Sequence, residues 1–216
     1  MAGLVVVCVL ALGVAACSVR DAKAEASASA SASASAAVAR AEKGIADANA
    51  SATASREAAL TPELRAKRDA ALAEPAPAKP EQMNEESPEG AASSVRYFLE
   101  LYRYAFMTGN TTELAAMSDN RCKFCQSTID DANNIHSKGG WADKWDQEII
   151  STTVYEKLEG YDYNRVKVVI NYGQTTWCYP GKVPEVAEPN KGQEVVFGVR
   201  YVGGRWVVGE GEVVSK

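Results

Sequence analysis

The chain has 216 residues, and its 23 Lys and Arg against 28 Asp and Glu give a formal net charge of −5 at pH 7. A protein that binds nucleic acid through the phosphate backbone needs a basic excess, so we expect no nucleic-acid partner. Every Trp, Tyr and Phe lies after residue 90. Because aromatic and branched side chains supply the buried area that offsets conformational entropy, we expect one globular domain, residues 90–216.

An uninterrupted apolar run occupies residues 4–16. Its 13 residues are too few for a helix that crosses a bilayer, which needs about 20, but they suit the central region of a signal peptide. We therefore expect residues 1–16 to be a signal peptide. One departure from the usual pattern is that Met1, Ala2 and Gly3 supply no Lys or Arg ahead of the run.

The apolar run ends in the tetrapeptide Val14, Ala15, Ala16, Cys17, which resembles the lipobox of bacterial lipoproteins. In that family the peptide is cut before the cysteine, whose thiol then carries a diacylglycerol. The resemblance implies lipid on Cys17 and a chain held at the outer face of the cell membrane, where two acyl chains give stable anchoring. The alternative is a plain secretory signal with a coincidental cysteine.

Residues 17–89 are of low complexity, and residues 26–35 alternate strictly between Ala and Ser. This alternation does not indicate a strand, because neither face is hydrophobic enough to bury. We expect a lipid-anchored linker that is mostly disordered or partly helical. Within it, Thr61 as N-cap and Pro62 at the first helical position predict a short helix, which would be marginal without a partner face.

The most strongly patterned segment begins near Ser93. Its apolar side chains recur with the spacing of an amphipathic helix that packs on a core. They are Val95, Phe98, Leu99, Tyr102, Ala105 and Phe106. Gly109 stands just past the last of them, where a helix normally ends. Two shorter helices are expected at residues 111–117 and 126–137.

After Trp145 the periodicity changes to that of β-strands. Four segments show it: residues 149–158, 163–172, 193–202 and 205–210. The last two are joined by Gly203 and Gly204, which predict a tight hairpin. Helices followed by four antiparallel strands indicate an α+β fold, with the helices packed on a curved antiparallel sheet. Residues 173–192 are too many for a simple connection, and such loops are usually functional or mobile.

Cys122 and Cys125 are three residues apart, a spacing that brings their Cα atoms within reach of a disulfide. A local disulfide is the simplest interpretation in an exported protein. A redox pair would need a βαβ context that the pattern lacks, and a zinc site would have to recruit Cys178 and His136 from distant stretches. We expect the disulfide, no metal ion and no cofactor.

The element order, together with two motifs, is similar to one protein family. The motifs are residues 97–110, which lead to Cys-Lys-Phe-Cys at 122–125, and Gly-Arg-Trp-Val-Val at 204–208. They resemble an actinobacterial lipoprotein family known as domain of unknown function 6318, over residues 89–214. Its layout is similar to the cone of the nuclear-transport-factor-2 and ketosteroid-isomerase superfamily. The resemblance implies a location at the cell membrane and a fold, but no activity.

Two classes of function stay open, and we favour a non-catalytic binding or scaffold module. His136 is the only histidine, and no serine lies in a nucleophile-elbow motif. Envelope proteins or a small apolar ligand are the expected partners. The candidate binding residues are aromatic side chains near glycine or proline: Trp141, Trp145, Trp177 and Tyr179. We expect them to form one surface or pocket rim, unless they lie in the core.

The alternative is an enzyme or small-ligand binder that uses the interior of the cone. That use would need a carboxylate projecting into an apolar cavity, where burial raises its pKa. The candidates by position are Asp130, Asp131, Asp143 and Asp146, each of which lies among polar neighbours.

Overall fold

The computed structural model describes residues 15–214, with side chains from residue 32 onward. The chain divides into two compact units, Met1–Ala54 and Ser55–Lys216, which we describe separately. The described helices are α1 (Ala15–Ala59), α2 (Pro62–Leu72), η1 (Glu81–Asn84), α3 (Pro88–Thr108), α4 (Thr112–Ala116) and α5 (Lys123–Ser137). The described strands are β1 (Trp141–Ala142), β2 (Gln147–Val154), β3 (Asn164–Tyr172), β4 (Thr175–Cys178), β5 (Glu185–Ala187), β6 (Asn190–Val202) and β7 (Arg205–Val213).

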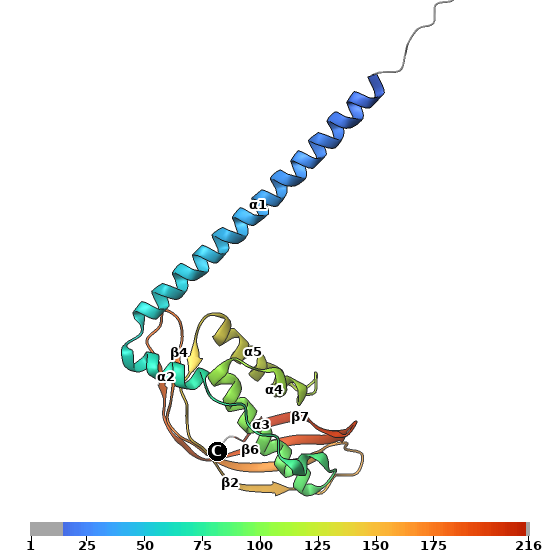
Figure 1. Ribbon diagram of the computed structural model, residues 1–216. Helices are drawn as coiled ribbons and strands as arrows, with labels where there is room; N and C mark the ends of the chain where they lie inside the picture. The colour runs from blue at the N-terminus through green and yellow to red at the C-terminus, as the bar shows by residue number, and fades with distance from the viewer. Residues whose placement is uncertain (1–14, 215–216) are drawn as a thin grey trace, which may run out of the picture. The chain divides into compact units, whose positions relative to one another are not determined.

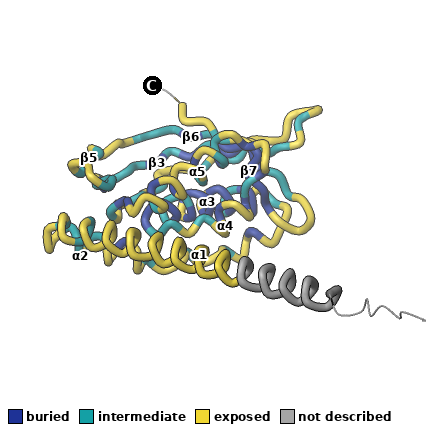
Figure 2. Tube along the Cα trace, turned by 90° about the horizontal axis from the view of Figure 1, so that it is seen from above, coloured by how far each residue is buried: buried dark blue, intermediate teal, exposed yellow. Residues whose placement is uncertain are grey.

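The Ala-rich and Ser-rich segment forms one continuous helix, α1, which is the helical one of the two states expected for this linker (Figure 1). Alanine has the highest intrinsic helix propensity of all residues, so a long run of it favours helix even without a packed face. Residues 32–55 are all exposed, Val38 and Ile45 included (Figure 2). Helix propensity rather than hydrophobic burial therefore accounts for this element.

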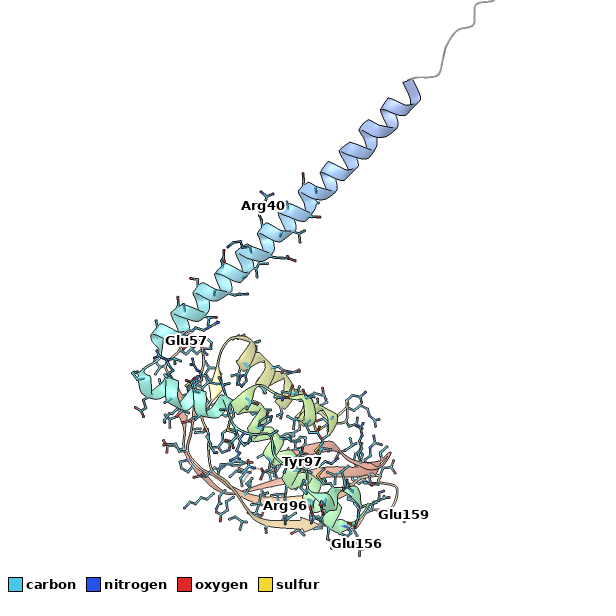
Figure 3. The ribbon with its side chains drawn as sticks, in the orientation of Figure 1. Arg40, Glu57, Arg96, Tyr97, Glu156 and Glu159 are labelled. Atoms are coloured by element: carbon cyan, nitrogen blue, oxygen red, sulfur yellow. A yellow bond between two sulfur atoms is a disulfide. The ribbon has the colours of Figure 1, made fainter. Side chains whose placement is uncertain are left out.

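Helix α2 forms as the sequence predicts, but it belongs to the folded unit. Thr61 Oγ1 accepts a hydrogen bond from the backbone N–H of Leu64 (3.2 Å), and Pro62 opens the helix. Glu57, which precedes α2 in the chain, makes an ion pair with Arg68 of α2 (Figure 3 labels Glu57). Ala71 is fully buried in the hydrophobic core. The expected linker of residues 17–89 thus ends earlier, because packing on the domain supplies the partner face that a short helix needs.

Residues between α2 and α3 also pack on the domain. Met83 of η1 is 3% exposed and joins the core. The indole N–H of Trp206, on the last strand, donates a hydrogen bond to the carbonyl oxygen of Glu85 (3.0 Å). The folded unit therefore begins at Ser55, whereas composition placed the start of the domain at residue 90.

Helix α3 is the central helix of the domain. It begins one to two turns earlier than its apolar stripe indicates, because Ser87 is the N-cap and Pro88 is the first helical residue. It ends at Gly109, whose φ of 78° is the left-handed conformation that glycine adopts at helix ends, as predicted. Its buried side chains pack on the larger sheet described below, where the centroid of the Phe98 ring lies 5.7 Å from that of Phe197.

Two antiparallel sheets follow the helices, which confirms the α+β fold. The larger has the strand order β2-β3-β6-β7, and the β6–β7 hairpin turns at Gly203 and Gly204 as predicted. The smaller has the order β1-β4-β5 and arises from the Trp141 segment and the long connection after β3. Residues 173–192, expected to form a loop, therefore contain two short strands and the first residues of β6.

Candidate binding groove

The predicted disulfide between Cys122 and Cys125 is present, with Cα atoms 5.2 Å apart. Cys122 is the N-cap of α5, and its sulfur accepts a hydrogen bond from the backbone N–H of Cys125 (3.2 Å). Cys125 Sγ lies 3.7 Å from the carbonyl oxygen of Val208 on β7. Both cysteines are buried, so the bridge closes the first turn of α5 where it packs beside β7.

The residues that a zinc site would have recruited are used otherwise. His136 Nε2 lies 2.9 Å from the carbonyl oxygen of Phe106, which ties the end of α5 to α3. Cys178 is a free, buried thiol, and this burial, followed by the nearby Asp143 carboxylate, raises its pKa. Within the described residues, no group of three or more His, Cys, Asp and Glu side chains could hold a metal ion.

Two of the four candidate aromatic residues lie in the core. Trp141 is 2% exposed and Trp145 is 4% exposed. Trp141 is on β1, opposite Cys178 of β4, and the backbone oxygen of Trp145 accepts a hydrogen bond from Arg103 (3.1 Å). These two tryptophans are part of the hydrophobic core, so they do not form the exposed surface or pocket rim that we expected from the sequence.

The other two candidates, Trp177 and Tyr179, are half-buried and line a groove. The Trp177 ring packs edge-on against Phe106, with ring centroids 5.1 Å apart, and lies 6.1 Å from the ring of Trp145. Trp177 therefore connects the buried aromatic cluster to the groove. The strand β4 positions it there: Trp177 is half-buried, whereas Thr175 and Cys178, at the two ends of the strand, are buried.

The groove has a volume of about 580 Å³ and lies between α5 and the β4–β5 hairpin, with the side chain of Phe106 from α3 also on its wall. Its lining residues are Phe106, Asp131, Asn134, Ile135, Trp177, Tyr179, Glu185, Val186 and Ala187. This volume falls in the range of pockets that hold drug-sized ligands. The groove is open to solvent, and aromatic and aliphatic side chains share its wall with two carboxylates and an amide, so apolar and polar groups both contribute to it.

Two carboxylates, Asp131 on α5 and Glu185 on β5, give the groove its electrostatic character. Burial raises the pKa of the Tyr179 hydroxyl, and the negative charges of Glu185 and Asp131 raise it further. Burial also raises the pKa of the Tyr102 hydroxyl, and the negative charge of Asp131 raises it further. Because both carboxylates line the groove, their negative charge would favour a positively charged group there.

The other three aspartates proposed for an enzymatic cone do not line the groove with Asp131, and Asp130 is exposed on α5. Asp143 makes an ion pair with Lys67 of α2 (3.2 Å). Asp146 is exposed, and its backbone oxygen accepts a hydrogen bond from the N–H of Gly173 (2.8 Å). Sequence reasoning missed Glu185 because β5 is three residues long and lies in a stretch rich in proline.

The boundaries of the folded unit agree with a family match. A model of a family of unknown function, DUF6318, matches residues 66–212, which is more than half of the chain. The chain belongs to this family. The DUF6318 match begins within α2 and ends within β7, so it includes the disulfide, the groove and both sheets.

One solved structure that the comparison matches is the intermembrane space region of the chloroplast protein ARC6. It is 14% identical to this chain, with a TM-score of 0.45, over 61% of this chain and 99% of that one. Among curated proteins, none matches the chain. At this level of similarity, nothing about the function of DUF6318 proteins is transferred from ARC6.

The predicted anchor lies largely outside the described residues. The signal peptide falls on residues 1–16, of which 1–14 are not described, and Cys17 is described only as a backbone position in α1. Across the residues that could be searched, no helix is long and apolar enough to cross a membrane.

Proposed function

We propose that this chain is an extracytoplasmic lipoprotein, anchored to the outer face of the cell membrane through Cys17, whose folded unit is a non-catalytic binding or scaffold module. The groove between α5 and the β4–β5 hairpin is the observation that carries the binding proposal. Its half-buried Trp177 and Tyr179 offer apolar surface that a partner would cover, and the exposed Val186 borders the groove on the β5 edge.

The location outside the cytoplasm is supported by two features. The apolar run of residues 4–16 has the length of a signal-peptide core and ends just before Cys17. The buried disulfide is of the kind that persists in oxidising compartments and is rare in the cytosol.

The groove is favoured over the cone interior because aromatic side chains fill the space between α3 and the larger sheet. Phe124 packs edge-on against Phe197 with ring centroids 5.8 Å apart, and Phe98 packs against both. We propose that the domain is a filled variant of the nuclear-transport-factor-2 cone. The arrangement of α3 across the bent β2-β3-β6-β7 sheet (Figure 1) is consistent with this proposal.

A site-specific photo-crosslinking experiment tests the binding role. The full chain is produced in the source organism with a photoreactive phenylalanine analogue at position 186 or, as a control, at position 202. Val186 and Val202 are similarly exposed, at 54% and 47%, but only Val186 lines the groove. We expect a discrete cross-linked product from position 186 and none from position 202. No product from position 186, or the same product from both, would contradict the proposal.

A further inference from the structure

The strand β5 presents a free edge beside the groove. The backbone N–H of Asp143 donates to the carbonyl oxygen of Thr176 (2.8 Å), so the backbone groups of Thr176 point toward β1. Backbone groups of successive residues in a strand alternate between its two sides, so those of Trp177 point toward β5. Val186 is paired opposite Thr176, and its own N–H and C=O therefore point away from β4.

No strand lies beyond β5 in the sheet order β1-β4-β5 of the described residues. The outward N–H and C=O of Val186 are one donor and one acceptor, which is what a single residue of an added antiparallel strand pairs with. An exposed edge of this kind is a template for an extended peptide.

The groove face of the hairpin fixes which side chains of an added strand would meet it. Trp177 and Glu185 are directly opposite each other, so their side chains lie on the same face, and Ala187 shares that face. All three line the groove. A residue placed opposite Glu185 on an added strand would project its side chain into the groove, with Cβ atoms about 5 Å apart.

The charge of the groove selects a basic side chain at that position. Glu185 and Asp131 are both groove-lining carboxylates, and the rings of Trp177 and Tyr179 offer faces that attract cations. The chain itself already uses one of these rings in this way, since Lys182 Nζ lies 5.4 Å from the centroid of Tyr179. Lys182 itself is not among the residues that line the groove.

Resting on the proposed function, we infer that the partner is a protein that adds an extended segment to the β5 edge and places a Lys or Arg side chain opposite Glu185, in the groove with Asp131. The backbone pairing at Val186 supplies affinity for an extended chain, and the carboxylates with the aromatic faces supply the preference for a basic residue.

Three probes separate the parts of this proposal in fluorescence anisotropy or competition binding to the full chain. The first is an acetylated peptide of sequence Thr-Val-Lys-Val-Thr. The second replaces its lysine by norleucine, which keeps the length and removes the charge. The third is Nα-acetyl-lysine amide, which keeps the charged side-chain amine but is too short to form a strand. We expect the lysine peptide to bind about tenfold more tightly than either of the other two.

Variants then assign the effect to the groove. Asp131→Asn combined with Glu185→Gln should reduce the preference for lysine over norleucine to about one, because the carboxylates are neutralised without loss of volume. Glu188→Gln is the matched control, since Glu188 is an exposed acid nearby that does not line the groove, and it should leave the preference unchanged.

The variant Val186→Pro tests the strand pairing. Proline is tolerated on an edge strand where its missing N–H would face solvent, so thermal unfolding should match that of the original chain. Both peptides should bind about tenfold more weakly, whereas Nα-acetyl-lysine amide should be unaffected.

Equal binding of the lysine and norleucine peptides, or of the lysine peptide and Nα-acetyl-lysine amide, would overturn the inference. So would a Val186→Pro variant that binds the lysine peptide as tightly as the original chain. If neither peptide binds while position 186 still cross-links specifically, the basic-peptide inference fails and the groove remains a binding site for another partner.

Discussion

Trp141 and Trp177 occupy adjacent strands of the smaller sheet, yet the two side chains meet very different surroundings. Trp141 is 2% exposed and packs within the core, whereas Trp177 is half-buried and has the groove on one side. Because the free energy lost on truncation depends on the cavity left behind, the two residues should respond differently to the same substitution.

Trp141→Ala should lower the free energy of unfolding by about 3–5 kcal/mol, the usual range for large aromatic side chains removed from a core. Trp177→Ala should cost less than Trp141→Ala, because solvent already reaches part of the side chain. Urea unfolding followed by far-ultraviolet circular dichroism measures both. Equal losses for the two variants would place Trp177 in the core with Trp141 and remove it from the groove wall.

The disulfide closes a very short loop, so its stabilisation should be modest. The chain-entropy account gives about 3 kcal/mol for a 15-residue loop and less for a shorter one. The double variant Cys122→Ala with Cys125→Ala should therefore lose less than about 3 kcal/mol from the lost cross-link. Reduction of the original chain should move its urea midpoint toward that of the variant. Cys178→Ala is the control, because it leaves the bridge intact; a reductant effect that persists in the double variant would contradict this assignment.

At the scale of elements, the segment before α3 determines where the domain begins. Ala71 of α2 and Met83 of η1 both lie in the core, and Glu85 accepts a hydrogen bond from Trp206. These contacts join residues far apart in the sequence. A domain without them would expose apolar surface that the other elements now cover.

A chain that starts at Ser55 should be as stable as the full chain, since it retains the whole compact unit. A chain that starts at Ser87 keeps the N-cap of α3 but loses α2 and η1, and its urea midpoint should fall clearly. The comparison between the two truncations isolates these elements from any effect of α1. Equal stability of the two would show that α2 and η1 add nothing to the fold.

Elements with a strong local signal were predictable from the sequence, and those that depend on distant partners were not. The stripe of Phe98 and Leu99, the glycine at 109 and the Gly203–Gly204 turn specify α3 and the β6–β7 hairpin locally. Strands β1, β4 and β5 have two, four and three residues, too few to show a period. Their pairing comes from the tertiary structure, which is why Glu185 was missed and Trp141 was placed on a surface.

At the scale of the whole molecule, the chain divides into a low-complexity helical unit and a folded unit that carries the groove. Residues 32–55 have no buried side chain, while the folded unit holds every core residue of the described chain. The proposed lipid on Cys17 lies in the first of these units, so anchoring and binding use separate parts of the chain. Each should therefore be removable without loss of the other.

Replacing Cys17 by alanine should release the chain from the membrane or leave it as an uncut precursor, because Cys17 is the proposed site of the acyl chains and of cleavage. Cys8→Ala is the matched control: it removes a cysteine from the apolar run but keeps Cys17, and it should leave anchoring unchanged. Membrane fractionation with detection of the intact mass distinguishes a lipidated from an unmodified chain.

The folded unit of the Cys17→Ala chain should still show native circular dichroism and still cross-link from position 186 when added to isolated envelopes. A correctly cleaved Cys17→Ala chain that stays in the membrane fraction would rule out the lipid anchor.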